Sequence, residues 1–292
     1  MRSSSNSGIP DGGPGRSQTV NPQCDRGHRQ KSLYIVGIGP GSLDHLTRRA
    51  IDVLKSVSTI AGYKTYIDLV LPLIEDKKII RTGMTQEVQR VESAIDAACS
   101  GSSCALISSG DPGIYAMAGL VFEICQAKKI AIVPAGLNSD KDALQIEVIP
   151  GVPAVCAGAS LLGAPLTHDF ATISLSDLLT PWALIEKRIE AAARADFVVV
   201  LYNPKSKKRT WQLEKAQQIL LKYLDKNTPT GIVTSAMRKN QDVQIVPLEK
   251  LHEADVNMQS TVFVGNSTSS RYIDFMITPR GYTKKYKVGS AL

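Results

Sequence analysis

Short apolar runs alternate with helix-patterned segments along most of this chain, and this alternation is its strongest structural constraint. The run at 33–36 precedes residues 46–57, whose apolar side chains recur with the spacing of one helix face. The runs at 104–107 and 146–150 are also separated by a helix-like stretch. Strands that alternate with helices form β-α-β units with mostly parallel strands. The pattern therefore predicts an α/β fold.

A second series of such elements follows a helix of small residues at 154–163. Its apolar runs at 171–176 and 197–202 are again separated by an amphipathic segment, and no sequence repeat relates the two series. We therefore expect two α/β domains, residues 31–163 and 164–292. A cleft between two domains is a usual ligand site, so we expect the ligand there.

Residues 1–30 differ from the rest of the chain. They are rich in Ser, Gly and Pro and contain few large apolar side chains. Such a segment buries too little surface to offset the entropy lost on ordering, so we expect a disordered tail. It also lacks the apolar core of a secretory signal.

The charge balance restricts the expected partners. The formal net charge is +7, and residues 1–31 carry +3 of it. The remaining excess suits an anionic small molecule, whereas nucleic-acid binding favours a stronger, clustered excess. No apolar run approaches the roughly 18 residues of a membrane helix. Neither a nucleic acid nor a membrane is therefore expected as a partner.

Cysteine usage indicates the compartment and bears on metal binding. The five cysteines form no C-x-x-C pair, and their number is odd. This favours reduced thiols and a cytoplasmic protein. The four histidines show no ligand spacing with the cysteines, so no metal site is expected.

Two glycine-rich loops follow predicted strands, GIGPG at 37–41 and SSGDPGIYAMAG at 108–119. The first lacks the third glycine and the later acid of a dinucleotide loop, and it also fits a plain turn with Asp44 at a helix start. In the second, Asp111 before Pro112 can cap a helix. A cap does not require the glycine on each side, which permits close approach of a ligand. Loops at strand ends of one open sheet lie where such folds bind ligands.

Two further loops each allow two interpretations. In IPGVPAVCAGAS, at 149–160, the small side chains either pack a helix tightly against a sheet or leave room for a flat ligand. In LYNPKSKKR, at 201–209, the basic run is either a solvated face or a site for carboxylates.

Together these loops resemble the tetrapyrrole methylases, which use S-adenosyl-L-methionine as methyl donor. The resemblance spans residues 31–288 and rests on VGIGPG, SSGDPGIYAMAG, IEVIPGVPA, GAPLTHDFATISLSDLLTPW, VVVLYNPKSKKR and VFVGNS. The pairing of HDFATISLSDLLTPW with YNPKSKKR is most similar to the C(17) branch of cobalamin biosynthesis. That branch methylates ring carbon C-17 of precorrin-3B, or of its cobalt analogue, and contracts the ring. Several relatives have Met directly after the Tyr of the fourth loop, where this chain has Asn203.

The resemblance implies a kidney-shaped homodimer of two-domain subunits, with the donor between the domains. Because the leaving group of a sulfonium is already activated, we expect that no metal is needed for the transfer. It implies that the following residues line the donor site: Pro40, Ser109, Gly110, Asp111, Ile114, Pro153, Ala154, Asn203 and Ala236. The carboxylates of an anionic tetrapyrrole are expected to contact the basic run Lys205, Lys207, Lys208 and Arg209.

Ring contraction requires proton movement, and His168 and Asp169 are candidates for general acid–base catalysis. A simpler role for His168 is that of a loop histidine bonded to backbone. Three other functions remain open: a sibling methylase acting at another ring carbon, a nicotinamide oxidoreductase, and a non-catalytic tetrapyrrole-binding protein. The failed dinucleotide pattern counts against the oxidoreductase. The sequence does not separate a metal-free from a cobalt-bound substrate.

Overall fold

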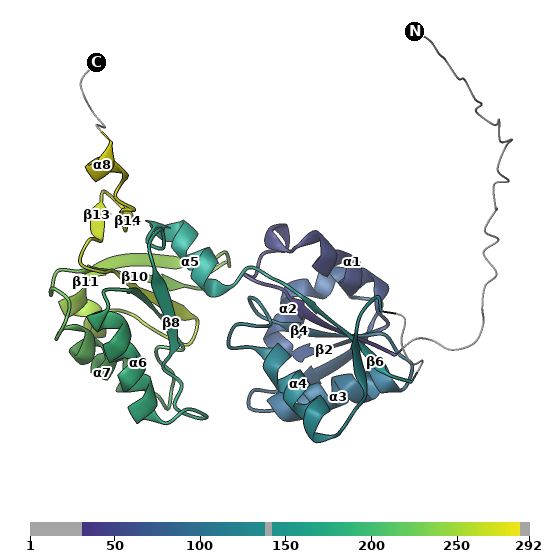
Figure 1. Ribbon diagram of the computed structural model, residues 1–292. Coiled ribbons are helices and arrows are strands. Elements are labelled where there is room, and N and C mark those ends of the chain that lie inside the picture. The colour runs from purple at the N-terminus through teal and green to yellow at the C-terminus, as the bar shows by residue number, and fades with distance from the viewer. Residues whose placement is uncertain (1–30, 138–141, 287–292) are drawn as a thin grey trace, which may run out of the picture.

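The computed structural model describes residues 31–137 and 142–286, and it forms two α/β lobes that lie side by side (Figure 1). The α/β fold expected from the alternating pattern is confirmed. The predicted N-terminal tail, residues 1–30, lies outside the described residues. Over the described part of the chain, no helix combines the length and the apolar character needed to cross a membrane.

The N-terminal lobe is built on a six-stranded sheet in the order β3-β2-β4-β1-β6-β5, and every neighbouring pair is parallel. The strands are β1 (Ser32–Gly37), β2 (Thr59–Tyr63), β3 (Lys78–Thr82), β4 (Cys104–Ser108), β5 (Ile132–Pro134) and β6 (Leu144–Ile149). The helices are α1 (Arg48–Ser56), α2 (Lys64–Val70), α3 (Glu87–Cys99) and α4 (Met117–Ala127), with 3-10 turns η1 (Leu43–His45) and η2 (Leu71–Leu73).

Both faces of this sheet are covered, which explains why its strands are apolar almost throughout. Leu33 and Ile35 of β1 pack against α3 and α4 on one face. Val36 of the same strand packs against α1 and α2 on the other, as the two-residue period of a strand requires. Asp44 does not begin α1, because it lies in η1 and Thr47 caps α1 by accepting from the Ala50 amide.

The C-terminal lobe is built on a five-stranded sheet in the order β11-β10-β12-β9-β8, in which only β8 and β9 are parallel. Its main strands are β8 (Phe170–Ser174), β9 (Val198–Tyr202), β10 (Pro229–Thr234), β11 (Asp242–Pro247) and β12 (Ser260–Val264). Its helices are α5 (Ala154–Leu162), α6 (Trp182–Arg194), α7 (Gln212–Leu220) and the 3-10 helix η3 (Leu248–Glu253). A small third sheet and a last helix comprise β7 (Gly163–Ala164), β13 (Ser270–Tyr272), β14 (Phe275–Ile277) and α8 (Tyr282–Lys285).

Helix α5 packs on the second sheet, so the chain changes lobe before this helix (Figure 1). Its Val155 and Leu162 belong to a core cluster with Phe263 of β12. A Cβ at Gly158 would lie 2.6 Å from Phe263 Cζ, so close helix–sheet packing explains the small residue there. The predicted boundary after residue 163 assigns this helix to the N-terminal domain and therefore differs from the packing.

Candidate active site

Three loops of the N-terminal lobe meet backbone to backbone at one edge of its sheet. They follow β1, β4 and β6, which are parallel neighbours, so all three leave the same edge. The Gly39 amide donates to the Gly110 carbonyl at 3.0 Å. A Cβ on Gly39 would lie 2.2 Å from Gly110 Cα, and one on Gly151 would lie 2.2 Å from Gly110 O. These positions need glycine because neighbouring backbone occupies the space of a side chain.

Asp111 ties two of these loops together. Its Oδ1 accepts from the Gly113 amide at 2.8 Å, and its Oδ2 accepts from the Gly151 amide at 3.2 Å. The bond to the residue two positions ahead is an Asx-turn. The expectation that Asp111 caps the following helix is wrong, because α4 begins only at Met117. The carboxylate organises the turn and its neighbour loop instead.

A cavity of about 670 Å³ lies between these loops and the C-terminal lobe. The C-terminal lobe contributes the end of β9, the end of β10 and the start of β12, which share one edge of the second sheet. All the residues predicted for the donor site line this cavity: Pro40, Ser109, Gly110, Asp111, Ile114, Pro153, Ala154, Asn203 and Ala236. The structure thus brings together five segments that are distant in sequence.

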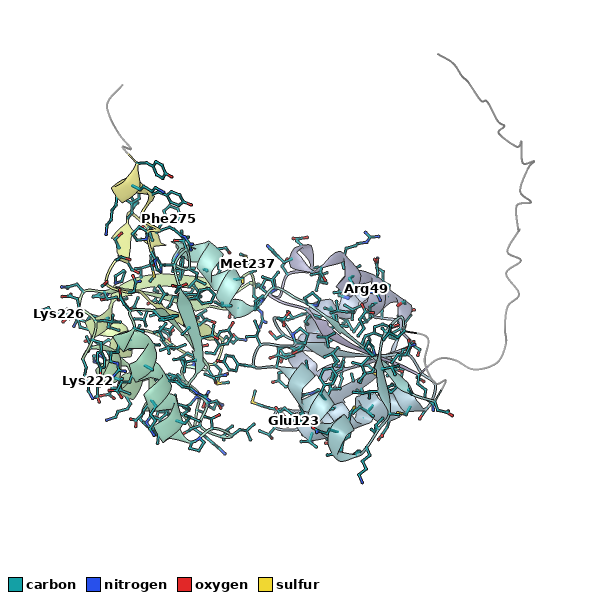
Figure 2. The ribbon with its side chains drawn as sticks, viewed as in Figure 1. Arg49, Glu123, Lys222, Lys226, Met237 and Phe275 are labelled. Atoms are coloured by element: carbon teal, nitrogen blue, oxygen red, sulfur yellow. The ribbon has the colours of Figure 1, made fainter. Side chains whose placement is uncertain are left out.

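Hydrogen bonds between the lobes cross at this cavity. Arg238, in the turn after β10, donates from Nε to the Pro40 carbonyl and from Nη2 to Ser109 Oγ, each at 3.0 Å. Tyr115, in the loop after β4, donates its hydroxyl to the Thr172 carbonyl of β8 at 2.9 Å. Met237, which precedes Arg238, lies on the side of the C-terminal lobe that faces the N-terminal lobe (Figure 2). These contacts hold the two walls of the cavity in a defined position.

Backbone strain gathers at the same place. Tyr115, Asn203 and Ser235 all line the cavity and have φ angles of 51°, 52° and 51°. Few residues other than glycine adopt this left-handed conformation, and such residues cluster at functional sites. The loops are therefore held in shapes that isolated turns of this composition would not favour.

Tyr202 is a neutral hydrogen-bonding group in the cavity wall. Its hydroxyl oxygen accepts from the Val155 amide at 2.9 Å, and its ring centroid lies 5.1 Å from that of Tyr115. Burial raises the pKa of Tyr202 to about 12. The phenol therefore stays protonated at neutral pH.

The basic run after β9 divides into a buried and an exposed part. Arg209 is 7 % exposed and donates from Nε to the Asn203 carbonyl at 2.9 Å, and another of its nitrogens contacts Met258 Sδ at 3.3 Å. These donors hold the loop together, and the contact of Arg209 with substrate stays a prediction. Lys207 and Lys208 are exposed, but neither they nor the partly exposed Lys205 lines the cavity.

The structure does not bring His168 and Asp169 to this cavity. They lie before β8, at its amino end, and line a separate hollow of about 310 Å³ together with Arg280. The five residues of β8 separate them from the edge that faces the cavity, a length of about 16 Å at 3.3 Å per residue. His168 Nδ1 accepts from the Asp169 amide at 2.9 Å, which agrees with the simpler role of a backbone-bonded loop histidine.

Several cavity residues were not anticipated from the sequence: Tyr63, Tyr66, Arg90, Tyr115, Tyr202 and Arg238. Arg90 sits in an amphipathic helix, where a charged residue normally indicates a solvated position. Arg238 sits in a polar turn that carries no motif. A signal was available for Tyr115 and Tyr202, because they lie inside the loops at 108–119 and 201–209 that carry the resemblance.

Comparisons with known proteins agree on one family. The family model described as Tetrapyrrole (Corrin/Porphyrin) Methylases matches residues 32–252. A cobalt-factor III methyltransferase of Priestia megaterium is 50% identical over 87% of this chain. The match covers 46% of that relative, so this chain spans about half of its length. A probable cobalt-factor III C(17)-methyltransferase of Salmonella typhimurium is 47% identical over 86% of this chain and 99% of its own length. A precorrin-3B C(17)-methyltransferase of a Sinorhizobium species is 36% identical over 86% of this chain and 97% of its own length.

Solved structures give the same answer for the fold. The crystal structure of the methyltransferase CobJ matches with a TM-score of 0.76 at 32% identity, covering 85% of this chain and 99% of that one. A uroporphyrin-III C-methyl transferase of Thermus thermophilus, solved with S-adenyl homocysteine, matches with a TM-score of 0.60 at 22% identity over 80% of this chain and 97% of its own. This second likeness concerns the fold alone. Because the family model covers more than half of the chain and close relatives align with most of it, the chain belongs to the tetrapyrrole (corrin/porphyrin) methylase family.

Proposed function

We propose that this protein transfers the methyl group of S-adenosyl-L-methionine to ring carbon C-17 of a cobalamin-pathway tetrapyrrole, with contraction of the ring. The observation that carries the proposal is the cavity between the lobes, which gathers every residue that the resemblance implies for the donor site. The names of the relatives from Priestia, Salmonella and Sinorhizobium support the position of methylation.

The cavity wall fits a nucleoside with a charged sulfur. Ile114, Pro153, Ala154 and Ala236 offer apolar surface to a flat base, and Ser109 and Asn203 add polar groups. A Cβ on Gly110 would lie 3.6 Å from its nearest neighbour, Pro153 Cα, and its φ is +63°, so its backbone is open to close approach. Backbone carbonyls suit a sulfonium better than a nearby cation does.

The donor supplies an already activated methyl group, so the chain's main task is alignment. Holding a carbon nucleophile in line with the methyl group and sulfur can supply several kcal/mol of rate acceleration. Asp111 fixes the relative position of two donor loops, and the neutral phenol of Tyr202 fixes the start of α5. Arg238 and Tyr115 hold the second lobe against those loops.

For the substrate we favour the cobalt-bound form. Relatives named for cobalt-factor III reach 50% and 47% identity, whereas the one named for precorrin-3B is 36% identical. We expect the exposed Lys207 and Lys208 and the partly exposed Lys205 to attract the carboxylates of such a substrate from outside the lining of the cavity. Because these lysines are solvated, each contact should contribute only about 0.2–1 kcal/mol.

The direct test incubates the purified protein with isotope-labelled S-adenosyl-L-methionine and either cobalt-factor III or precorrin-3B. We expect label in a product whose mass gains one methyl group and whose NMR spectrum assigns that group to C-17. The cobalt compound should be turned over faster. Methylation at another carbon would identify a sibling methylase, and binding of pigment without transfer would identify a non-catalytic binding protein.

The lysine contribution has matched controls on the same lobe. Lys222 and Lys226 lie on its outer side, away from the N-terminal lobe (Figure 2). Replacing Lys205, Lys207 and Lys208 together by Ala should raise KM for the tetrapyrrole with little change in kcat. Replacing Lys222 and Lys226 should leave KM unchanged.

We also propose that the protein acts as a homodimer in the cytoplasm, as the resemblance implies. The four described cysteines are free thiols, which suits a reducing compartment. Tyr272, Ile273 and Phe275 of the β13–β14 hairpin are exposed apolar side chains, which suits a subunit contact. Light scattering coupled to size exclusion measures the mass, and a monomer at micromolar concentration would contradict the dimer.

A further inference from the structure

Arg90 is a buried cation that lines the cavity. It lies on α3, is 5 % exposed, and donates to Thr82 Oγ1 at 2.6 Å and to the Gly83 carbonyl at 2.8 Å. The only acceptor of its Nη1 among the described residues is the sulfur of Met117, at 3.6 Å. No carboxylate of the described residues lies within ion-pair distance of it, and Glu87 acts on it only from farther away.

Arg238 is a second cation that lines the cavity; it is partly buried and comes from the other lobe. Its Nε and Nη2 donate to Pro40 and Ser109, whereas its Nη1 donates to no group of the described chain. It lies so close to the donor loop that a Cβ on Gly41 would be 2.4 Å from its Nε. It also has no carboxylate partner among residues 31–137 and 142–286.

The two arginines bracket one loop of the donor site. Arg238 contacts Ser109 at the beginning of that loop, and Arg90 contacts Met117 at its end. Desolvation lowers the pKa of both guanidinium groups, and the hydroxyl of Tyr66 acts on both from the same cavity. Arginine nevertheless stays charged in proteins. Two positive charges therefore line this cavity with no carboxylate of the described residues within ion-pair distance, and Glu87, which lines the same cavity, acts on Arg90 only from farther away.

Buried charges without partners are costly, and proteins retain them where a ligand supplies the opposite charge. The carboxylate of Asp111 cannot do so, because both of its oxygens accept from backbone amides. The planar fork of a guanidinium matches a carboxylate well. A donor sulfonium would be repelled by the same two groups, so this part of the cavity suits an anion.

We infer that Arg90 and Arg238 form a carboxylate-binding subsite, built from both lobes, that anchors the ligand of this cavity. The inference rests on the proposed function, because both the methionine portion of the donor and the rim of a tetrapyrrole carry carboxylates. Binding of either carboxylate would pull the lobes together, since one arginine comes from each lobe.

The test measures binding, not turnover, in Arg90→Gln, Arg238→Gln and the control Arg188→Gln, which alters an exposed arginine of α6. Three probes are titrated: S-adenosyl-L-homocysteine, which keeps the amino-acid carboxylate; 5′-methylthioadenosine, which lacks it; and cobalt uroporphyrin III, which carries carboxylates only on its rim. We expect Arg90→Gln and Arg238→Gln to lower the affinity for one carboxylate-bearing probe by about 30-fold or more. Binding of 5′-methylthioadenosine and the control variant should be unchanged, and Arg90→Lys should recover part of the loss.

The pattern of losses identifies the source of the carboxylate. Weaker binding of S-adenosyl-L-homocysteine to the two variants assigns the subsite to the donor. Weaker binding of cobalt uroporphyrin III assigns it to the substrate. If the two variants bind all three probes more weakly to the same extent, or bind all of them as tightly as the unaltered protein does, the inference of a carboxylate-binding subsite is wrong. If the unaltered protein binds none of the probes, the proposed function itself fails.

Discussion

At the scale of single residues, Asp111 is the side chain on which the geometry of the donor loops depends most directly. Asp111→Ala leaves the amides of Gly113 and Gly151 without their acceptor. The exposed Gly113 amide can bond to water, whereas the partly buried Gly151 amide costs about 1–3 kcal/mol if it stays unsatisfied. We expect a lower melting temperature and weaker binding of S-adenosyl-L-homocysteine by calorimetry. Asp111→Asn keeps one acceptor oxygen, so its melting temperature and its affinity for S-adenosyl-L-homocysteine should fall less. Unchanged affinity in a folded Asp111→Ala protein would show that the two loops hold their positions without this carboxylate.

Tyr202 makes a prediction about alkaline pH. Its pKa in the folded protein is about 12, above the ordinary value of 10.0, so the unfolded chain loses this proton first as pH rises. The stabilisation is complete below pH 10 and falls between pH 10 and 12, by at most about 1.4 kcal/mol per pH unit. Denaturant unfolding of Tyr202→Phe at pH 9, 10 and 11 should show a shallower loss of stability than the unaltered protein. Equal slopes would contradict the buried phenol.

At the scale of elements, the glycine loops behave as one packed unit. Gly39→Ala places a Cβ within about 2.2 Å of the backbone of the neighbouring loop, and backbone cannot move aside as a flexible side chain can. We expect a large loss of stability together with loss of donor-analogue binding. Gly119 of α4 is the matched control, because a Cβ there meets nothing within 4 Å. Gly119→Ala should stabilise the helix by roughly 0.5–1 kcal/mol. A Gly39→Ala protein as stable as the Gly119→Ala protein would refute the packing described for these loops.

At the scale of the whole molecule, the cavity belongs to both lobes, and a ligand bound there should stabilise both. Binding at one hundred times Kd adds about 2.7 kcal/mol to the unfolding free energy. Hydrogen exchange with S-adenosyl-L-homocysteine should therefore show protection in the loop 109–117 of the N-terminal lobe. It should show protection as well in 203–209 and 235–238 of the C-terminal lobe. Protection confined to the N-terminal lobe would mean that the second lobe does not contribute to donor binding.

The sequence by itself determined the elements and the places where loops carry function. Apolar period and turn residues are local properties, so the strands at 33–36, 104–107 and 197–202 and the loops at their ends were predictable. The donor-site residues, from Pro40 to Ala236, were implied by the resemblance, and the glycines of the loops at 37–41, 108–119 and 149–160 that support it are required by close backbone contacts. Those glycines were predictable because backbone geometry restricts their positions to very few residue types.

The tertiary structure alone decided how side chains distant in sequence combine. The sequence of a basic run does not distinguish side chains that face solvent from side chains that hydrogen-bond within their own loop. Only the tertiary packing showed that Arg209 is buried. Periodicity does not say at which end of a strand a loop meets a ligand, and only the structure showed that His168 lines a separate hollow. Nor does it indicate that Arg90 and Arg238 line the same cavity. The physical reason is that local pattern encodes elements, whereas charge and burial at a site depend on strand order and on the contact between two lobes.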